Sequence, residues 1–271
     1  MSQQTPACNQ IGRTGEWAGM ALSGILPTSR RELLAGLTLG AAAPSIARTT
    51  GRVSAIAFDA FVLFSPAEIV RRAVEMVGTS ADAFVASATA RLFSYTWLYT
   101  SAARYIGFEE LARDAFGFTA SASGLNIGGS QLDRLVEGYS SLEPWPDVAV
   151  VLHSLRQRGV RLAVLSNLPR HSLESSLRSA RLRDHFEKVL STDEARRFKP
   201  APEAYALASS RLGLPKRWIG FAASAAWDAA GATWFGYPTV WVNRSHAPSE
   251  EPQSRSLIVT SDMEGVLELT R

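Results

Sequence analysis

The chain has 271 residues, of which 46% are hydrophobic and 20% are charged, a composition typical of a globular protein with a buried core. Its 28 Lys and Arg residues barely exceed its 25 Asp and Glu residues, and they are scattered, which argues against the basic run or stripe of a nucleic-acid-binding protein. The single cysteine, Cys8, excludes an intrachain disulfide and a cysteine-based metal site.

The N-terminal segment has the order of features found in an export signal. Arg30 and Arg31 precede a weakly hydrophobic run at residues 35–43, shorter than the roughly 20 residues that a membrane-spanning helix needs. Small residues at 41–47 offer cleavage sites. The segment resembles a twin-arginine signal, so we expect residues 1–47 to be removed and the mature protein to be periplasmic, without a stable membrane anchor.

Short apolar runs that end in polar residues predict buried parallel strands. The first covers residues 53–58 and ends at Asp59; another covers residues 161–165 and ends at Ser166 and Asn167. Similar runs occupy residues 218–222, 239–243 and 257–260. Because ligands bind beyond the carboxyl ends of the strands in open α/β sheets, we expect these polar residues to meet at one site.

Helical patterns separate the predicted strands. They lie at residues 147–158, 172–180, 202–212 and 227–235. Strands alternating with helices predict a doubly wound parallel sheet, a Rossmann-like α/β core made of residues 53–65 and 143–271.

A long insertion follows the first strand. Its helical patterns lie at residues 67–77, 81–105, 108–116 and 131–139. Residues 121–130 are rich in glycine and serine and predict a loop. We therefore expect residues 66–142 to form a helical cap domain over the strand ends.

Four short segments near the predicted strand ends stand out. In chain order they are Ala57-Phe58-Asp59-Ala60-Phe61, Leu165-Ser166-Asn167, Phe198-Lys199-Pro200 followed by Tyr205, and Ala223-Ser224-Ala225-Ala226-Trp227-Asp228. The predicted cap adds Tyr95-Thr96-Trp97-Leu98. Together these segments resemble the haloacid dehalogenase superfamily and, within it, the type II 2-haloacid dehalogenases. The resemblance covers nearly all of residues 53–245.

The residues around Asp59 favour attack on carbon. A carboxylate at a strand end can attack carbon or phosphorus and form a covalent intermediate. Phosphatases of the superfamily carry a second aspartate two residues after the nucleophile, where this chain has Phe61. The fourth segment offers Asp228 as its single carboxylate, which furnishes a magnesium site poorly. We therefore expect neither a metal nor another cofactor.

The resemblance also implies a mechanism and a set of site residues. Asp59 displaces halide from C2 of a small 2-haloacid, and water then attacks the resulting ester at the carboxyl carbon of Asp59 to release a 2-hydroxy acid. Lys199 holds Asp59, and Asp228 activates the water. The expected substrate-binding residues are Ala60, Phe61, Ser166, Asn167 and Tyr205. The aromatic cap is expected to exclude water, and the resemblance allows a homodimer.

The chain departs from the pattern of the subfamily at several positions. Thr89 replaces the cap arginine that receives the halide, and residues 62–63 are Val-Leu in place of Gly-Thr, so we expect a hydroxyl contact to the nucleophile to be missing. Ala223 and Ala225 replace a serine and an asparagine. Two alternatives therefore stay open: a metal-dependent phosphatase of the same superfamily, and a catalytically degenerate binding protein on this fold.

Overall fold

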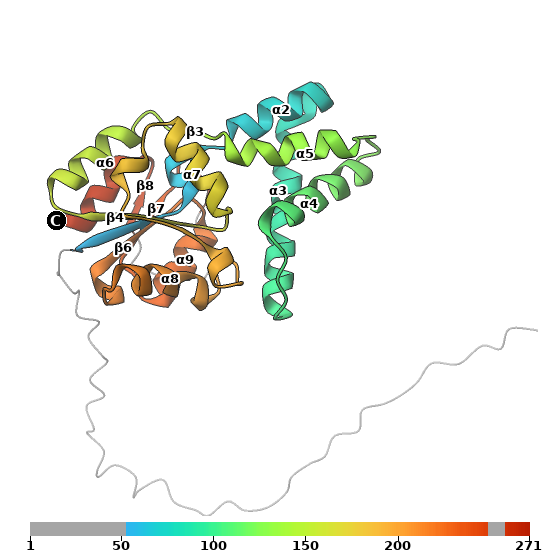
Figure 1. Ribbon diagram of the computed structural model, residues 1–271. Coiled ribbons are helices and arrows are strands. Elements are labelled where there is room, and N and C mark those ends of the chain that lie inside the picture. Colours follow the sequence, from blue (N-terminus) through green and yellow to red (C-terminus); the bar gives the residue numbers. More distant parts are fainter. Residues whose placement is uncertain (1–52, 249–257) are drawn as a thin grey trace, which may run out of the picture. The chain divides into compact units, whose positions relative to one another are not determined.

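The computed structural model describes residues 53–248 and 258–271, so the predicted export signal lies outside the described residues. A six-stranded parallel sheet with strand order β5-β4-β1-β6-β7-β8 forms the core (Figure 1). The strands are β1 (Ala55–Phe58), β4 (Arg161–Ser166), β5 (Lys188–Ser191), β6 (Ile219–Ala223), β7 (Thr239–Val242) and β8 (Ile258–Thr260). The predicted doubly wound α/β fold is confirmed.

Apart from the edge strand β8, the strands of the sheet are buried on both faces, which explains their apolar runs in the sequence. Helices cover these faces: α6 (Val148–Gln157), α7 (Arg170–Ser179), α8 (Pro202–Leu212) and α9 (Ala226–Phe235). On β1, Ile56 and Phe58 join the core cluster that contains residues of α6 and α7. Ala55 and Ala57 point to the opposite face and join the residues of α8 and α9. Small alanines on that face let α8 and α9 pack close to the strand.

The strand order places the carboxyl end of β1 at the centre of the sheet. From β1 the chain builds outward through β4 and β5, then returns to the other side of β1 for β6, β7 and β8. β1 pairs with both β4 and β6. Such a reversal of strand order leaves a crevice at the strand ends, where ligands of this fold class bind.

Four helices form the cap between two short strands. They are α2 (Ala67–Val77), α3 (Ala81–Ser101), α4 (Phe108–Ala122) and α5 (Gly129–Glu137). Strands β2 (Phe64–Ser65) and β3 (Glu143–Pro144) pair antiparallel where the chain leaves and re-enters the core. Figure 1 shows α2 to α5 grouped beside the α/β core, with α3 running along the core toward α9.

Some boundaries differ from the expectations. Strand β5 was not predicted, because Val189 and Leu190 are its only apolar residues and make too short a run to stand out. Helix α3 ends at Ser101 rather than at Tyr105, because the Tyr105 ring stacks on Phe198 of the core at 5.2 Å and its hydroxyl bonds to Asp193. Helix α4 continues to Ala122, since alanines extend it into the predicted loop.

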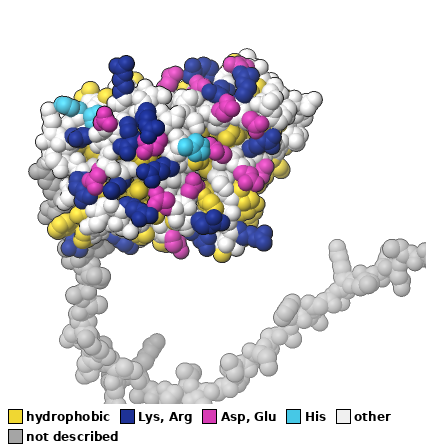
Figure 2. All heavy atoms as spheres, viewed as in Figure 1, with side chains coloured by type: hydrophobic (Ala, Val, Ile, Leu, Met, Phe, Trp, Pro, Cys, Tyr) yellow, Lys and Arg dark blue, Asp and Glu magenta, His cyan; other side chains and the backbone are white. Residues whose placement is uncertain are grey.

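The surface mixes both signs of charge. Figure 2 shows basic and acidic side chains interspersed over the face in view. Several of them form exposed ion pairs, such as Arg161 with Glu187 and Arg113 with Asp133. Across the described residues, none of the helices is both long and apolar enough to cross a bilayer. The homodimer stays a prediction.

Candidate active site

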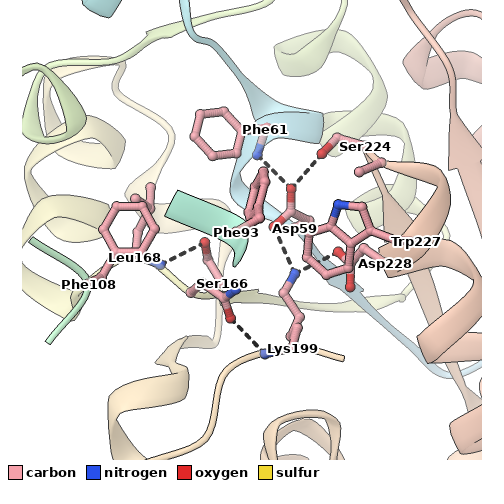
Figure 3. A pocket seen from close by; sticks show the side chains of 12 residues that line it. Asp59, Phe61, Phe93, Phe108, Ser166, Leu168, Lys199, Ser224, Trp227 and Asp228 are labelled. Atoms are coloured by element: carbon pink, nitrogen blue, oxygen red, sulfur yellow. Dashed lines mark hydrogen bonds and ion pairs between the residues drawn. The ribbon is translucent and has the colours of Figure 1, made fainter. Parts of the chain in front are cut away.

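Asp59 lies directly after β1, at the centre of the crevice, with 6% of its surface exposed. It is the N-cap of the one-turn helix α1 (Ala60–Leu63), and its Oδ2 accepts a hydrogen bond of 3.0 Å from the backbone N–H of Phe61. The same Oδ2 accepts a second hydrogen bond, of 2.7 Å, from the hydroxyl of Ser224. The helix cap thus fixes the orientation of a carboxylate that lines a cavity (Figure 3).

Lys199 lies between two carboxylates. Its Nζ is 2.8 Å from Oδ1 of Asp59 and 2.7 Å from Oδ2 of Asp228 (Figure 3). The same Nζ donates to the carbonyl oxygen of Leu165 at 3.3 Å. Only 1% of Lys199 is exposed. Burial alone lowers the pKa of this ammonium, but the attraction of Asp228 and Asp59 outweighs burial and raises it. Lys199 therefore stays protonated and holds the two carboxylates together.

Asp228 is a carboxylate with an altered proton affinity. Burial raises its pKa; Lys199 opposes this effect, Asp59 reinforces it, and the balance is a pKa of about 6. The Tyr205 hydroxyl donates to Oδ1 of Asp228 at 2.7 Å. Since a base works best with a pKa near the working pH, Asp228 is better suited to take a proton from water than an ordinary aspartate.

Two of the expected substrate-binding side chains lie away from the cavity lining. Ala60 and Tyr205 are fully buried, and neither is among the residues that line the cavity. Tyr205 lies behind Asp228, where Gly231 makes room for it: a Cβ on Gly231 would be 2.6 Å from the Tyr205 hydroxyl oxygen. We therefore assign Tyr205 to the positioning of Asp228, and Ala60 to packing, because its side chain is covered by the core.

Ser166 and Asn167 follow β4 and line the same cavity as Asp59. The Asn167 Oδ1 accepts from the backbone N–H of Lys199 at 2.9 Å and from the Thr192 hydroxyl at 3.2 Å, which fixes the amide. Its Nδ2 is buried without a hydrogen-bond partner. A buried unpaired donor costs about 1–3 kcal/mol, so an acceptor on a bound molecule would be stabilised there.

The cavity has a volume of about 30 Å³ and mainly apolar walls. Phe61 from the core and Phe93 and Phe108 from the cap form much of the lining. The Phe93 ring lies 5.1 Å from the ring of Trp227, and Trp97 packs against the same indole at 5.6 Å. These contacts join α3 of the cap to α9 of the core and shield the carboxylates from water.

The sequence did not identify the cavity residues Phe93, Phe108 and Leu168. It placed Ser224, Ala225 and Trp227 in the fourth segment but gave them no role in the site. Phe93 precedes Trp97 by four residues and so shares its helix face, which is a signal within the cap segment. Ser224 follows β6 just as Asp59 follows β1, which is a signal in the strand pattern.

The donors in the site do not suit a divalent cation. Lys199 occupies the space between Asp59 and Asp228, so the two carboxylates already share a cation. The position two residues after Asp59 holds the phenyl ring of Phe61. Elsewhere in the described residues, no group of three or more His, Cys, Asp or Glu side chains is arranged to hold a metal ion.

Comparison with known proteins fits this geometry. The family model of haloacid dehalogenase-like hydrolases matches residues 53–236. The chain belongs to this family. An (S)-2-haloacid dehalogenase from Pseudomonas sp. (strain YL) is 36% identical over 200 residues, which cover 73% of this chain and 86% of that protein. Haloacetate dehalogenase H-2 from Moraxella sp. (strain B) is 35% identical, with 71% and 87% of the two chains covered.

Solved structures of haloacid dehalogenases agree with the fold. The crystal structure of the L-2-haloacid dehalogenase RSc1362 superposes with a TM-score of 0.77 at 32% identity and covers 81% of this chain and 99% of its own. An L-2-haloacid dehalogenase from Xanthobacter autotrophicus with covalently bound chloropropionic acid gives a TM-score of 0.74 at 26% identity, with 80% and 98% covered.

This haloacid dehalogenase-like hydrolase compensates for one of the departures expected from its sequence, the missing hydroxyl contact to Asp59. The expectation that the nucleophile has no hydroxyl contact is wrong, because Ser224 supplies one from the strand end of β6. The loss of the cap arginine at Thr89 is not compensated, because the described residues that line the cavity include no arginine. Arg91 is exposed, and its guanidinium lies 4.1 Å from the Phe118 ring, away from the cavity lining. Lys199 is therefore the one cationic side chain among the described residues that line the cavity.

Proposed function

We propose that the protein is an (S)-2-haloacid dehalogenase that works through an ester on Asp59. In the first step the Asp59 carboxylate attacks C2 of the substrate and displaces halide with inversion. In the second step water attacks the carboxyl carbon of Asp59, and the 2-hydroxy acid departs with the original aspartate oxygen. The relatives named (S)-2-haloacid dehalogenase support this reaction, and so does the structure of a relative with chloropropionic acid covalently bound.

A single observation carries the proposal. The carboxylate of Asp59 is held by a protonated lysine at the wall of a small cavity with mainly apolar walls, in a setting that suits attack on carbon. The unpaired Nδ2 of Asn167 is positioned to bind the carboxylate or halide of the substrate. The space for the second carboxylate of a phosphatase holds Phe61 instead.

The test is product analysis with both enantiomers of 2-chloropropionate. We expect chloride and (R)-lactate from the (S) enantiomer, since inversion occurs once, at C2. A phosphate ester with added magnesium serves as the comparison substrate. Phosphate release without chloride release would establish the phosphatase alternative, and a folded protein inert toward both substrates would establish the binding-protein alternative.

Asp228 predicts the pH dependence of the second step. With a pKa of about 6, its carboxylate is deprotonated above pH 6 and accepts the proton of the attacking water. In the ester the charge of Asp59, which contributes to this raised pKa, is absent, so we expect the rate of ester hydrolysis to fall as the pH decreases through a value below 6. Single-turnover ester decay measured from pH 5 to pH 8 checks this.

An isosteric variant completes the test of Asp228. Asp228→Asn cannot take the proton, and we expect the ester to persist at every pH in this range, with a loss of about 10²- to 10⁴-fold in its hydrolysis. An unaltered pH profile in this variant would assign the ionisation to another group.

We propose further that residues 1–47 are a twin-arginine export signal and that the mature protein is periplasmic. The order of Arg30-Arg31, the weakly hydrophobic run and the small residues supports this. Arg30→Lys with Arg31→Lys is expected to retain the protein in the cytoplasm, as measured by cell fractionation. The matched exchange Arg13→Lys should leave export unchanged. Equal periplasmic delivery of the double variant would refute the signal.

A further inference from the structure

The two oxygens of Asp59 have different surroundings. Oδ2 accepts two fixed hydrogen bonds, from the Phe61 N–H at 3.0 Å and from the Ser224 hydroxyl at 2.7 Å. Oδ1 accepts one, from Lys199 at 2.8 Å. A carboxylate oxygen offers two in-plane lone pairs, so both lone pairs of Oδ2 are engaged whereas Oδ1 keeps one that is free. Oδ1 is therefore the oxygen available to attack C2.

This assignment fixes the role of Oδ2 after the first step. Once Oδ1 is bonded to C2 of the substrate, Oδ2 becomes the carbonyl oxygen of the ester. Both of its donors are already in place at hydrogen-bonding distance. When water then attacks the carboxyl carbon, negative charge develops on Oδ2. Donors that are fixed before the reaction stabilise such charge without having to reorganise.

We propose that Ser224, together with the backbone N–H of Phe61, forms the oxyanion hole for hydrolysis of the Asp59 ester. The inference rests on the proposed dehalogenase function and adds a residue to its second step. Ser224 lies at the end of β6, and its backbone carbonyl accepts a hydrogen bond of 3.2 Å from the indole N–H of Trp241, which is itself 1% exposed. On the other side, the indole N–H of Trp145 fixes the carbonyl of Phe61 at 3.2 Å. The backbone that carries each donor, Ser224 and Phe61, is therefore fixed by a hydrogen bond from a tryptophan.

The second step balances with the groups in place. Water adds to the carboxyl carbon and gives its proton to Asp228, while the carbonyl electrons move onto Oδ2. As the oxyanion collapses, the bond from the carboxyl carbon to Oδ1 breaks. Oδ1 leaves with the product and takes a proton from Lys199. The proton on Asp228 then returns to Lys199 across their 2.7 Å contact. Asp59 leaves this step as a carboxylic acid with one oxygen from water, and the carboxylate is regenerated when that remaining proton passes to solvent.

This role for Ser224 explains how the chain tolerates its departures. The resemblance places hydroxyl and amide groups at the positions of Leu63, Ala223 and Ala225, where this chain has apolar side chains. Ser224, which lies between Ala223 and Ala225, supplies the hydroxyl contact to Asp59 that these other positions lack. In this chain, therefore, one side-chain hydroxyl carries the stabilisation of the ester carbonyl.

The experiment separates the two chemical steps in Ser224→Ala. Rapid-quench measurement of chloride reports ester formation from (S)-2-chloropropionate, and intact-protein mass spectrometry follows the ester on Asp59. We expect a stoichiometric burst of chloride followed by a hydrolysis rate that is lower by roughly 10²-fold, so that the ester accumulates. Ser224→Thr keeps the hydroxyl and should recover most of the hydrolysis rate. Ser210→Ala, exposed on α8, is the matched control and should behave as the unaltered protein.

The outcomes distinguish the inference from the function on which it rests. If the unaltered protein releases no chloride, the proposed function fails. If the unaltered protein turns over and Ser224→Ala hydrolyses its ester at the same rate, the oxyanion role of Ser224 is overturned and the dehalogenase function stands. An equal loss in the burst and in hydrolysis would also overturn it, because Ser224 would then only orient Asp59. The chloride burst itself shows that the variant is folded.

Discussion

Asp59→Asn is expected to abolish chloride release from (S)-2-chloropropionate and to leave the fold intact. The amide has the shape of the carboxylate, but its oxygen is too weakly nucleophilic to displace halide. Loss of a covalent nucleophile commonly lowers turnover by about 10⁴-fold or more. Asp228 is the other carboxylate among the described lining residues, and its two oxygens are engaged by Lys199 and by the Tyr205 hydroxyl. Chloride release, with circular dichroism as the folding control, measures the effect.

The control for this prediction is a carboxylate of the surface. Glu203 is exposed in the first turn of α8, so the variant Glu203→Gln should retain full activity. Residual turnover above about 1% in Asp59→Asn would indicate that another group attacks the substrate, for instance water activated by Asp228. Formation of the ester on a residue other than Asp59 would contradict the mechanism directly.

Lys199→Met is expected to remove activity and much of the stability at neutral pH. The lysine is buried between two carboxylates, and methionine leaves both of them without a cation. Breaking a buried ion pair by removing one partner typically costs about 3–5 kcal/mol. The free energy of unfolding from urea titration measures this loss. The exposed Lys216→Met is the matched control and should change it by less than about 1 kcal/mol.

The destabilisation of Lys199→Met should depend on pH in a defined direction. Without the cation, which opposes the effect of burial, the pKa of Asp228 rises further above that of the unfolded chain. Groups with raised pKa values favour the folded state at low pH, and this contribution is lost as the pH rises through the folded values. The stability deficit should therefore be smaller at pH 5 than at pH 8. A constant deficit would show that the loss arises from packing rather than from charge.

The sequence predicted the fold and the polar centre of the site well, for a physical reason. Parallel strands buried on both faces appear as apolar runs, and the residue after each run lies at the strand ends that form the crevice. Asp59, Ser166 and Asn167 were found in this way, and the family pattern added Lys199 and Asp228. Each of these residues lines the cavity.

The apolar part of the site was not predictable to the same degree. Phe93 and Phe108 come from the cap, and their contact with the core depends on how two units of structure pack, which no local pattern encodes. Tyr205 was assigned to the substrate through the family pattern, in which it accompanies Lys199. Its orientation behind Asp228 depends on the space left by Gly231 on a different helix. The hydroxyl contact from Ser224 to Asp59 likewise depends on the tertiary structure, because the two residues follow different strands.

The ion triplet of Asp59, Lys199 and Asp228 has a consequence for turnover. With two anions and one cation the cluster carries a net negative charge, and the substrate brings a further carboxylate into a cavity where, among the described lining residues, Lys199 is the one cation. Alkylation of Asp59 neutralises one anion, so the repulsion present on substrate entry is relieved in the ester. Hydrolysis restores that anion beside the product carboxylate. Loss of the Asp59 charge therefore favours the ester over the bound substrate. Return of that charge repels the carboxylate of the hydroxy acid, so ester hydrolysis promotes product release.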